Sequence, residues 1–297
     1  MTRSKIVLVV AICVLCMGSM YAEEPDIIVY GQNAPEWNKN LGVTATRGSC
    51  SSEAEVCIKN VGLLLAGQHT KHFYLNLPTD PVKSLSYASF YSKASKTEPR
   101  LYEVDLDDFS DHFTVWCRTN PHCDRVLNEI IDNVKSANAK LKSGLTIYED
   151  DIPILQANPH LTPEIRNKVD TIHLYIHERA NGPKFERYLK QIKEMFPNAK
   201  AIAGVYAYDR LDFEKCHGCS AAEARDLQKQ TLREQVRLLQ SGALVGLEFY
   251  PGHFGWEEKW EGWNDPAECA PGRKEQCAEN TKAMHNDAVM ILRGLKK

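Results

Sequence analysis

Carboxylic acids recur at the ends of apolar segments in the second half of the chain. Asp150, Glu248 and Asp209 stand at or beside such ends, and Glu149 adjoins the first of them. Cleavage of a glycosidic bond uses two carboxyl groups, one protonated to assist the leaving oxygen and one ionised to attack or to activate water. A neighbouring like charge and poor solvation can keep one of the two protonated near neutral pH. The pattern predicts this chemistry for Asp150 and Glu248, with Glu149 and Asp209 as rivals.

Aromatic residues accompany these acids and could stack on the apolar faces of sugar rings. The residues expected to orient a carbohydrate or tune the acids are Tyr148, Tyr175, His177, Tyr206, Tyr208, Tyr250 and Trp256. Phosphate chemistry would instead favour clustered Arg or Lys side chains or a glycine-rich cradle. The sequence has no such cradle, and the two-carboxylate mechanism calls for no cofactor.

Two other functions stay open. His173 and His177 share one face of a strand, and either could bind a metal ion with Asp150 or Asp209 in a carbohydrate deacetylase or a phosphodiesterase. The backbones of these histidines would lie roughly 13 Å apart, so one ion would not use both. A barrel that binds carbohydrate without cleaving it is the third possibility, because a fold does not determine a function.

The acids and aromatic residues alternate with apolar residues along four expected strands, 144–150, 171–177, 201–209 and 244–250. A doubly wound sheet lies under helices on both faces, so its strands are almost continuously apolar. A barrel gives each strand an outer face under helices and an inner face near an open mouth. The alternation therefore favours a barrel with the polar set inside. It places Asp150 and Glu248 on the inner face and Glu149 on the outer one.

The order of elements predicts an α/β protein with an eight-stranded (β/α)8 barrel, whose first half can be irregular. Strands 26–31 and 72–77 join the four above, and helices are expected over about 120–142, from 162, over 183–196, over 220–241 and from 274. Segments 100–106 and 112–117 would complete the eight, but either could be irregular or helical. An incomplete barrel or a doubly wound sheet is the alternative.

The first 22 residues predict an export signal. Arg3 and Lys5 precede a short apolar run, and small residues follow as far as Ala22, which is typical of a cleaved secretory signal. We therefore expect a single catalytic domain over 23–297, secreted or periplasmic and free of the membrane after cleavage. The formal net charge of −3 argues against nucleic-acid or anionic-membrane partners.

The cysteines support the same compartment. Beyond the expected signal they form four close pairs, Cys50 with Cys57, Cys117 with Cys123, Cys216 with Cys219 and Cys269 with Cys277. In an exported chain such pairs predict local disulfides. The pair at 216–219 could instead be a metal knuckle or a redox pair, although the second ligand pair of a zinc knuckle is missing.

Three strand ends resemble those of a known class of enzyme, the secreted (β/α)8-barrel glycoside hydrolases. "GVYAYD" at 204–209 resembles the Tyr-x-Tyr-Asp strand end of chitinase-like barrels, and "LTIYEDD" and "GLEFY" resemble acid-bearing strand ends of several glycosidase families. The resemblance covers residues 143–250. It implies a fold and a substrate class, and it assigns no catalytic residue because the chitinase-like DxxDxDxE run is absent from the sequence.

Overall fold

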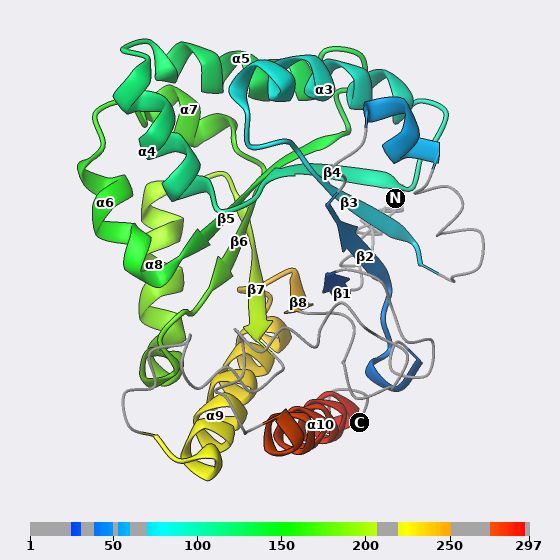
Figure 1. Cartoon of the computed structure of the whole chain (residues 1–297), viewed down its shortest axis with the longest axis vertical. Helices are drawn as coiled ribbons and strands as arrows, with labels where there is room; N and C mark the ends of the chain where they lie inside the picture. Colours follow the sequence, from blue (N-terminus) through cyan, green and yellow to red (C-terminus); the bar gives the residue numbers. More distant parts are fainter. Residues whose placement is uncertain are drawn as a thin grey trace, which may run out of the picture.

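A computed structural model describes residues 25–30, 39–49, 53–59, 70–206, 219–250 and 274–294 of this chain. Eight parallel strands close into a barrel in sequence order, and helices surround it (Figure 1). The strands are β1 Asp26–Tyr30, β2 Ala45–Gly48, β3 His72–Asn76, β4 Leu101–Leu106, β5 Lys142–Tyr148, β6 Thr171–Tyr175, β7 Lys200–Tyr206 and β8 Gly246–Tyr250. The predicted (β/α)8 barrel is confirmed.

The helices follow their strands in the order that a (β/α)8 barrel requires. They are α3 Pro81–Ala94, α4 Phe109–Thr119, α5 Cys123–Lys135, α6 Ile152–Ala157, α7 Pro163–Lys168, α8 Phe185–Met195, α9 Ala221–Gln240 and α10 Lys274–Arg293, with 3₁₀ turns η1 Glu149–Asp151 and η2 Arg179–Lys184. Local chemistry fixes several starts. The Ser220 hydroxyl accepts the backbone N–H of Glu223, whose side chain accepts the N–H of Ser220 in return, a capping box that satisfies two free donors.

Apolar residues on the outer faces of the strands pack against the helices and form the main core. On β5 and β6 these residues include Leu145, Ile147, Ile172 and Leu174, each at most 1% exposed. Each such side chain stabilises the fold by about 1.5–3 kcal/mol relative to an exposed position. Strand register aligns the inner faces as well, since Thr146 pairs with His173 and Gly204 with Glu248. The alternating pattern of the sequence thus separates an apolar outer layer from a polar interior.

The first half of the barrel departs from the sequence-based expectation. Segment 112–117, one candidate for the missing strands, lies within helix α4. The remaining strand is β2, whose sequence "ATRG" carries Ala45 as its only aliphatic residue. A strand this short, with an arginine pointing inward, has no hydrophobic alternation by which it could be recognised.

The disulfide between Cys117 and Cys123 is present, with their Cα atoms 5.0 Å apart. Cys57 and Cys219 are also disulfide-bonded, and the partners expected for them, Cys50 and Cys216, lie outside the described residues. Cys269 also lies outside the described residues, so its pair with Cys277 stays a prediction. Among the described helices, none is both long and apolar enough to cross a membrane.

Candidate active site

Arg47 of β2 occupies the centre of the barrel and holds together side chains from four other strands. Its guanidinium is fully buried and contacts the carboxylates of Asp105, by a short salt bridge, and of Glu248, at 2.9 Å. It also donates to the Asn76 side chain at 2.7 Å and to the Thr146 hydroxyl at 2.7 Å. A buried cation is tolerated only when it is paired and hydrogen-bonded to this degree.

His173 lies between two acids in the same interior. Its Nε2 is 2.7 Å from Glu103 Oε1, and its Nδ1 is 2.6 Å from Glu248 Oε2. The second contact lacks hydrogen-bond geometry, so we count it as an ion pair. Burial alone would lower the pKa of His173, but Glu248 and Glu103 outweigh burial and raise that pKa to about 10. The imidazole is therefore a cation at neutral pH.

Glu248 is held in its ionised form. Burial would raise the pKa of this carboxyl, but Arg47 and His173 outweigh burial and lower it to about 2. The Tyr175 hydroxyl also donates to Glu248 Oε1 at 2.5 Å. Asp105 responds in the opposite sense, because its burial prevails over Arg47 and His173 and raises its pKa to about 7. Neighbouring acids with separated pKa values are typical of sites that do acid/base chemistry.

Above this interior, at the carboxyl ends of the strands, lies a group of aromatic and polar side chains that we call the mouth. It is formed by Tyr30, Ser49, Asn76, Asp107, Asp108, Tyr148, Asp150, His177, Tyr206 and Tyr250. Successive rings touch around it, with centroid distances of 5.0 Å for Tyr30 and Tyr250, 5.9 Å for Tyr250 and Tyr206, 5.1 Å for Tyr206 and Tyr175, 6.1 Å for Tyr175 and Tyr148, and 3.7 Å for Tyr148 and His177. Six aromatic rings from different strands and loops are therefore gathered at the carboxyl end of the barrel.

Two acids that follow β4 project into the mouth. Asp107 is 28% exposed and accepts hydrogen bonds from Tyr30 at 2.9 Å and from Asn76 at 2.8 Å, while its other oxygen lies 3.2 Å from Arg47. Asp108 precedes helix α4 but does not cap it with its side chain. It accepts the Tyr148 hydroxyl at 2.5 Å instead. Its φ of 45° is the only left-handed one among the described non-glycine residues.

The predicted acids occupy different environments. Glu248 faces the interior, as the alternation indicates. Asp150 lies in η1 beyond the end of β5, where its side chain is 45% exposed and 3.3 Å from His177 Nδ1. Glu149 is buried, and its carboxylate accepts the backbone N–H groups of His177 at 2.7 Å and Glu178 at 2.9 Å. Glu149 thus fixes the loop that carries His177.

The predicted substrate-orienting residues Tyr148, Tyr175, His177, Tyr206 and Tyr250 are all brought together here. Asp209, Tyr208 and Trp256 lie outside the described residues. The sequence pattern predicts no role for Arg47, Glu103, Asp105, Asp107 or Asp108. One signal for three of them was present, because Glu103, Asp105 and Asp107 alternate with apolar residues in "EVDLD".

The two histidines proposed as metal ligands belong to different groups. His177 stands at the mouth beside Asp150, whereas His173 is buried beside Glu103 and Asp105. In the described part of the chain, Glu103, Asp105 and His173 offer ligand atoms within 4.8 Å of one another. An ion there would replace the hydrogen bond between His173 and Glu103 and would lie next to the Arg47 guanidinium, which contacts Asp105. The arrangement fits a proton between His173 and Glu103 better than a metal ion.

Comparisons with known proteins give only remote structural matches. No family model and no curated protein matches the chain. Solved structures of glycoside hydrolases do match in fold. Active domain 2 of the thermostable chitinase of Pyrococcus furiosus is 12% identical over 77% of this chain and 83% of that one, with a TM-score of 0.47. XacCel5A in complex with cellopentaose is 8% identical over 80% of this chain and 93% of that one, with a TM-score of 0.47.

A Bacteroides uniformis beta-glucuronidase is 12% identical over 77% of this chain, with a TM-score of 0.49. This chain covers 30% of that protein. The closed eight-stranded barrel confirms the fold that the resemblance implies, and the likeness to these structures concerns the fold alone.

Proposed function

We propose that this protein is a secreted glycoside hydrolase that binds a poly- or oligosaccharide at the mouth and cleaves it by two-carboxylate catalysis. The observation that carries the proposal is the chain of contacting aromatic rings beside Asp107, Asp108 and Asp150 and directly above ionised Glu248. Rings bind sugar faces without charge, and the acids supply the chemistry.

In this mechanism Glu248 is the ionised carboxylate and Asp150 donates the proton. Glu248 has no exposed surface, so Tyr175, which covers it, has to turn aside before a substrate reaches it. Asp107 is the rival for the ionised role, because it shares the Arg47 guanidinium with Glu248 and is already exposed. The separation of the two acting acids would set the stereochemistry, about 5 Å for retention and roughly 6.5–9.5 Å for inversion.

The proposal is tested by incubating the purified protein with a panel of oligosaccharides and measuring new reducing ends. Wild type and the variants Glu248→Gln, Asp107→Asn and Asp150→Asn are compared, with Asp132→Asn on the exposed face of α5 as the matched control. We expect Asp150→Asn, and one of the other two, to lose at least about a hundredfold in rate while sugar binding is retained. Full turnover in all three site variants would overturn the assignment.

The same panel separates the two alternatives. An oligosaccharide that binds wild type but survives long incubation would favour a noncatalytic carbohydrate-binding barrel. Activity that disappears with a chelator and returns with a divalent ion would favour a metal-dependent hydrolase that uses His173 or His177.

A further inference from the structure

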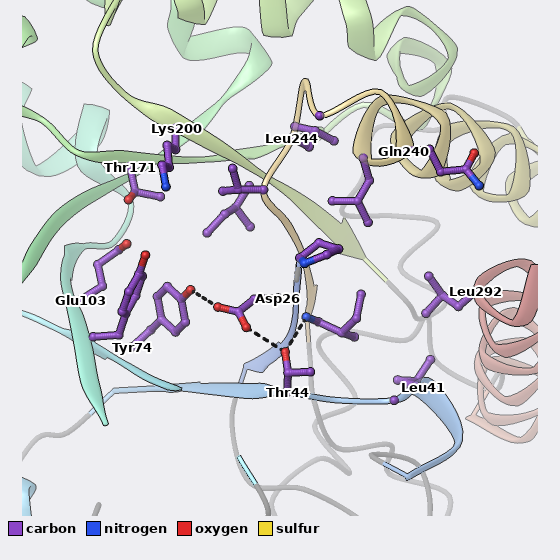
Figure 2. Close-up of a pocket in the computed structure, with 18 residues that line it drawn as sticks. Asp26, Leu41, Thr44, Tyr74, Glu103, Thr171, Lys200, Gln240, Leu244 and Leu292 are labelled. Atoms are coloured by element: carbon purple, nitrogen blue, oxygen red, sulfur yellow. Dashed lines mark hydrogen bonds between the residues drawn. The ribbon is translucent and has the colours of Figure 1, made fainter. Parts of the chain in front are cut away.

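A cavity of about 920 Å³ opens at the amino end of the barrel, away from the mouth. It is bounded by the first residues of several strands, among them Asp26, Thr171 and Lys200, and by Leu239 and Leu292 from helices α9 and α10. Figure 2 shows Asp26, Thr171, Lys200 and Leu292 around one hollow. Its volume is within the range of roughly 300–1,000 Å³ that is usual for small-molecule sites.

One side of the cavity is aliphatic. Its apolar lining consists of Ile27, Leu41, Ile202, Leu239, Leu244, Val245 and Leu292, and most of these side chains are less than 5% exposed. A hydrocarbon body of a ligand would find the same surroundings there that the protein's own core provides.

The opposite side is polar, and its two acids are satisfied to different degrees. Asp26 accepts hydrogen bonds from the Tyr74 hydroxyl at 2.8 Å and the Thr44 hydroxyl at 2.9 Å, and it lies 2.8 Å from His72 Nδ1. These contacts are drawn in part in Figure 2. Asp26 therefore has its partners within the protein.

Glu103 lines the same cavity, but only one of its two carboxylate oxygens has a partner. Its side chain is fully buried, and Oε1 is engaged by His173 at 2.7 Å. Oε2 has no hydrogen-bond partner among the described residues and no accessible surface, so a ligand reaches it only when the Glu103 side chain turns toward the cavity. A buried carboxylate oxygen without a donor is costly, and native structures rarely leave one unless a water, an ion or a ligand supplies the donor.

We infer that this amino-end cavity is a binding site for a small molecule with an aliphatic body and a hydrogen-bond-donating head, an ammonium or a hydroxyl group, that donates to Glu103 Oε2. The aliphatic body lies against the leucines and the head against the acids. A carboxylate head is excluded, because it would place a third negative charge beside Asp26 and Glu103 and offers no proton. Among the described residues that line the cavity, Lys200 is the one cationic side chain, and it is exposed at the rim.

The site stands apart from the proposed sugar chemistry, because its residues are at the other end of the barrel and its occupancy is measurable without turnover. Glu103 nevertheless contacts His173, which contacts Glu248. Only the side chains of Glu103 and His173 therefore lie between a molecule bound in the cavity and Glu248.

The test is isothermal titration of the full chain with three probes of equal length, n-octylammonium, n-octanol and n-octanoate. Three variants accompany wild type. Glu103→Gln removes the acceptor charge, Gln240→Trp narrows the cavity from an exposed position on α9, and Gln230→Trp places the same bulk elsewhere on the exposed surface of α9 as the matched control. Circular dichroism establishes that each variant is folded.

We expect octylammonium or octanol to bind wild type and Gln230→Trp alike, and octanoate to bind neither. Glu103→Gln should weaken octylammonium binding about tenfold or more, and Gln240→Trp should weaken both donor probes. If Glu103→Gln does not fold, Gln240→Trp decides alone. Absence of binding by both donor probes, equal binding of octanoate, or binding unchanged in Gln240→Trp would overturn the inference.

Discussion

Asp108 is the residue at which backbone conformation and side-chain chemistry are most clearly combined. An aspartate before a helix normally accepts a backbone N–H of the first turn, yet Asp108 leaves its helix uncapped and holds the Tyr148 hydroxyl. Its left-handed φ costs energy that glycine would not incur. Burial, Tyr206 and Asp108 together raise the pKa of Tyr148, so this phenol remains a donor. The strained turn thus aims one acid at one aromatic ring of the mouth.

This arrangement predicts that a substitution at position 108 can weaken binding without lowering stability. Asp108→Gly should leave the free energy of unfolding unchanged or raise it by up to about 1 kcal/mol, whereas Asp108→Ala should lower it by about 1 kcal/mol. Both substitutions release the Tyr148 hydroxyl, so both should weaken oligosaccharide binding. Urea denaturation and titration with the sugar found in the panel measure the two quantities. Binding that simply follows stability, with Asp108→Gly as good as wild type, would contradict this role.

The residues of the site were predictable where they alternate and hidden where they do not. Tyr148, Tyr175 and Glu248 stand on clearly alternating strands, and their convergence follows from the parity of a parallel barrel. Arg47 lies on a four-residue strand with too few apolar neighbours to establish a face. Its position at the centre depends on partners distant in sequence, such as Glu248, and no local pattern reports such pairing.

Among the elements, β7 shapes the site through the absence of a side chain. Gly204 lies beside Tyr175 of β6, and a Cβ built on Gly204 would fall 2.2 Å from atoms of the Tyr175 ring. The ring therefore lies flat against the β7 backbone, and this position lets its hydroxyl reach Glu248. Real Cβ atoms do not approach a ring so closely, so any larger residue at 204 must displace Tyr175.

We expect Gly204→Ala to disturb the mouth while the barrel remains folded. The displaced Tyr175 should lose its hydrogen bond to Glu248, which costs about 1.5–3 kcal/mol for a bond to a charged group. Its ring should also leave its place between Tyr148 and Tyr206, so sugar binding should fall. Tyr175→Phe is the matched comparison, because it removes the same hydroxyl without moving the ring. Titration of both variants with one oligosaccharide measures the effect. Unchanged binding in Gly204→Ala would show that the ring has room to shift.

At this scale the sequence predicted the second half of the barrel better than the first. Strands β5 to β8 alternate clearly, helix α8 lies between Pro183 and Pro197, and helix α9 begins at a capping box, so their positions could be located closely. The helix expected over 120–142 ends earlier, at Lys135. Segment 112–117 is helical because Phe109, Phe113 and Trp116 pack as one buried helical face. The segment also contains a short apolar run, and such a run by itself does not distinguish a strand from a helix.

In the whole molecule, the barrel interior is held by charges as well as by packing. Arg47 links β2 with β3, β4, β5 and β8, and His173 adds β6 through Glu103 and Glu248. Removing one member of such a buried network leaves an unpaired charge, which typically costs 3–5 kcal/mol. The same charges set the potential beneath the mouth, so the stability of the fold and the ionisation of the candidate site depend on one set of groups.

This coupling predicts a specific dependence of stability on pH. The pKa of His173 is raised to about 10 in the folded chain, from about 6.5 when unfolded. Its contribution to the free energy of unfolding is therefore complete below about pH 6.5 and is lost as the pH rises through about 10. Asp105, whose pKa is raised to about 7 in the folded chain, lowers the free energy of unfolding by an amount that grows up to that pH and is constant above it. Between about pH 8 and 10 the change should therefore come from His173.

The measurement compares wild type with His173→Gln, whose amide still reaches Glu103 but carries no charge. Urea denaturation across that pH range gives the difference in free energy of unfolding, in which lysines, tyrosines and other groups common to both proteins cancel. We expect wild type to lose its advantage by up to about 1.4 kcal/mol per pH unit. A constant difference would mean that His173 is neutral in the folded chain. Glu248 would then depend on Arg47 and Tyr175 for its charge, and the contact of His173 with Glu103 and Glu248 would not be an ion pair.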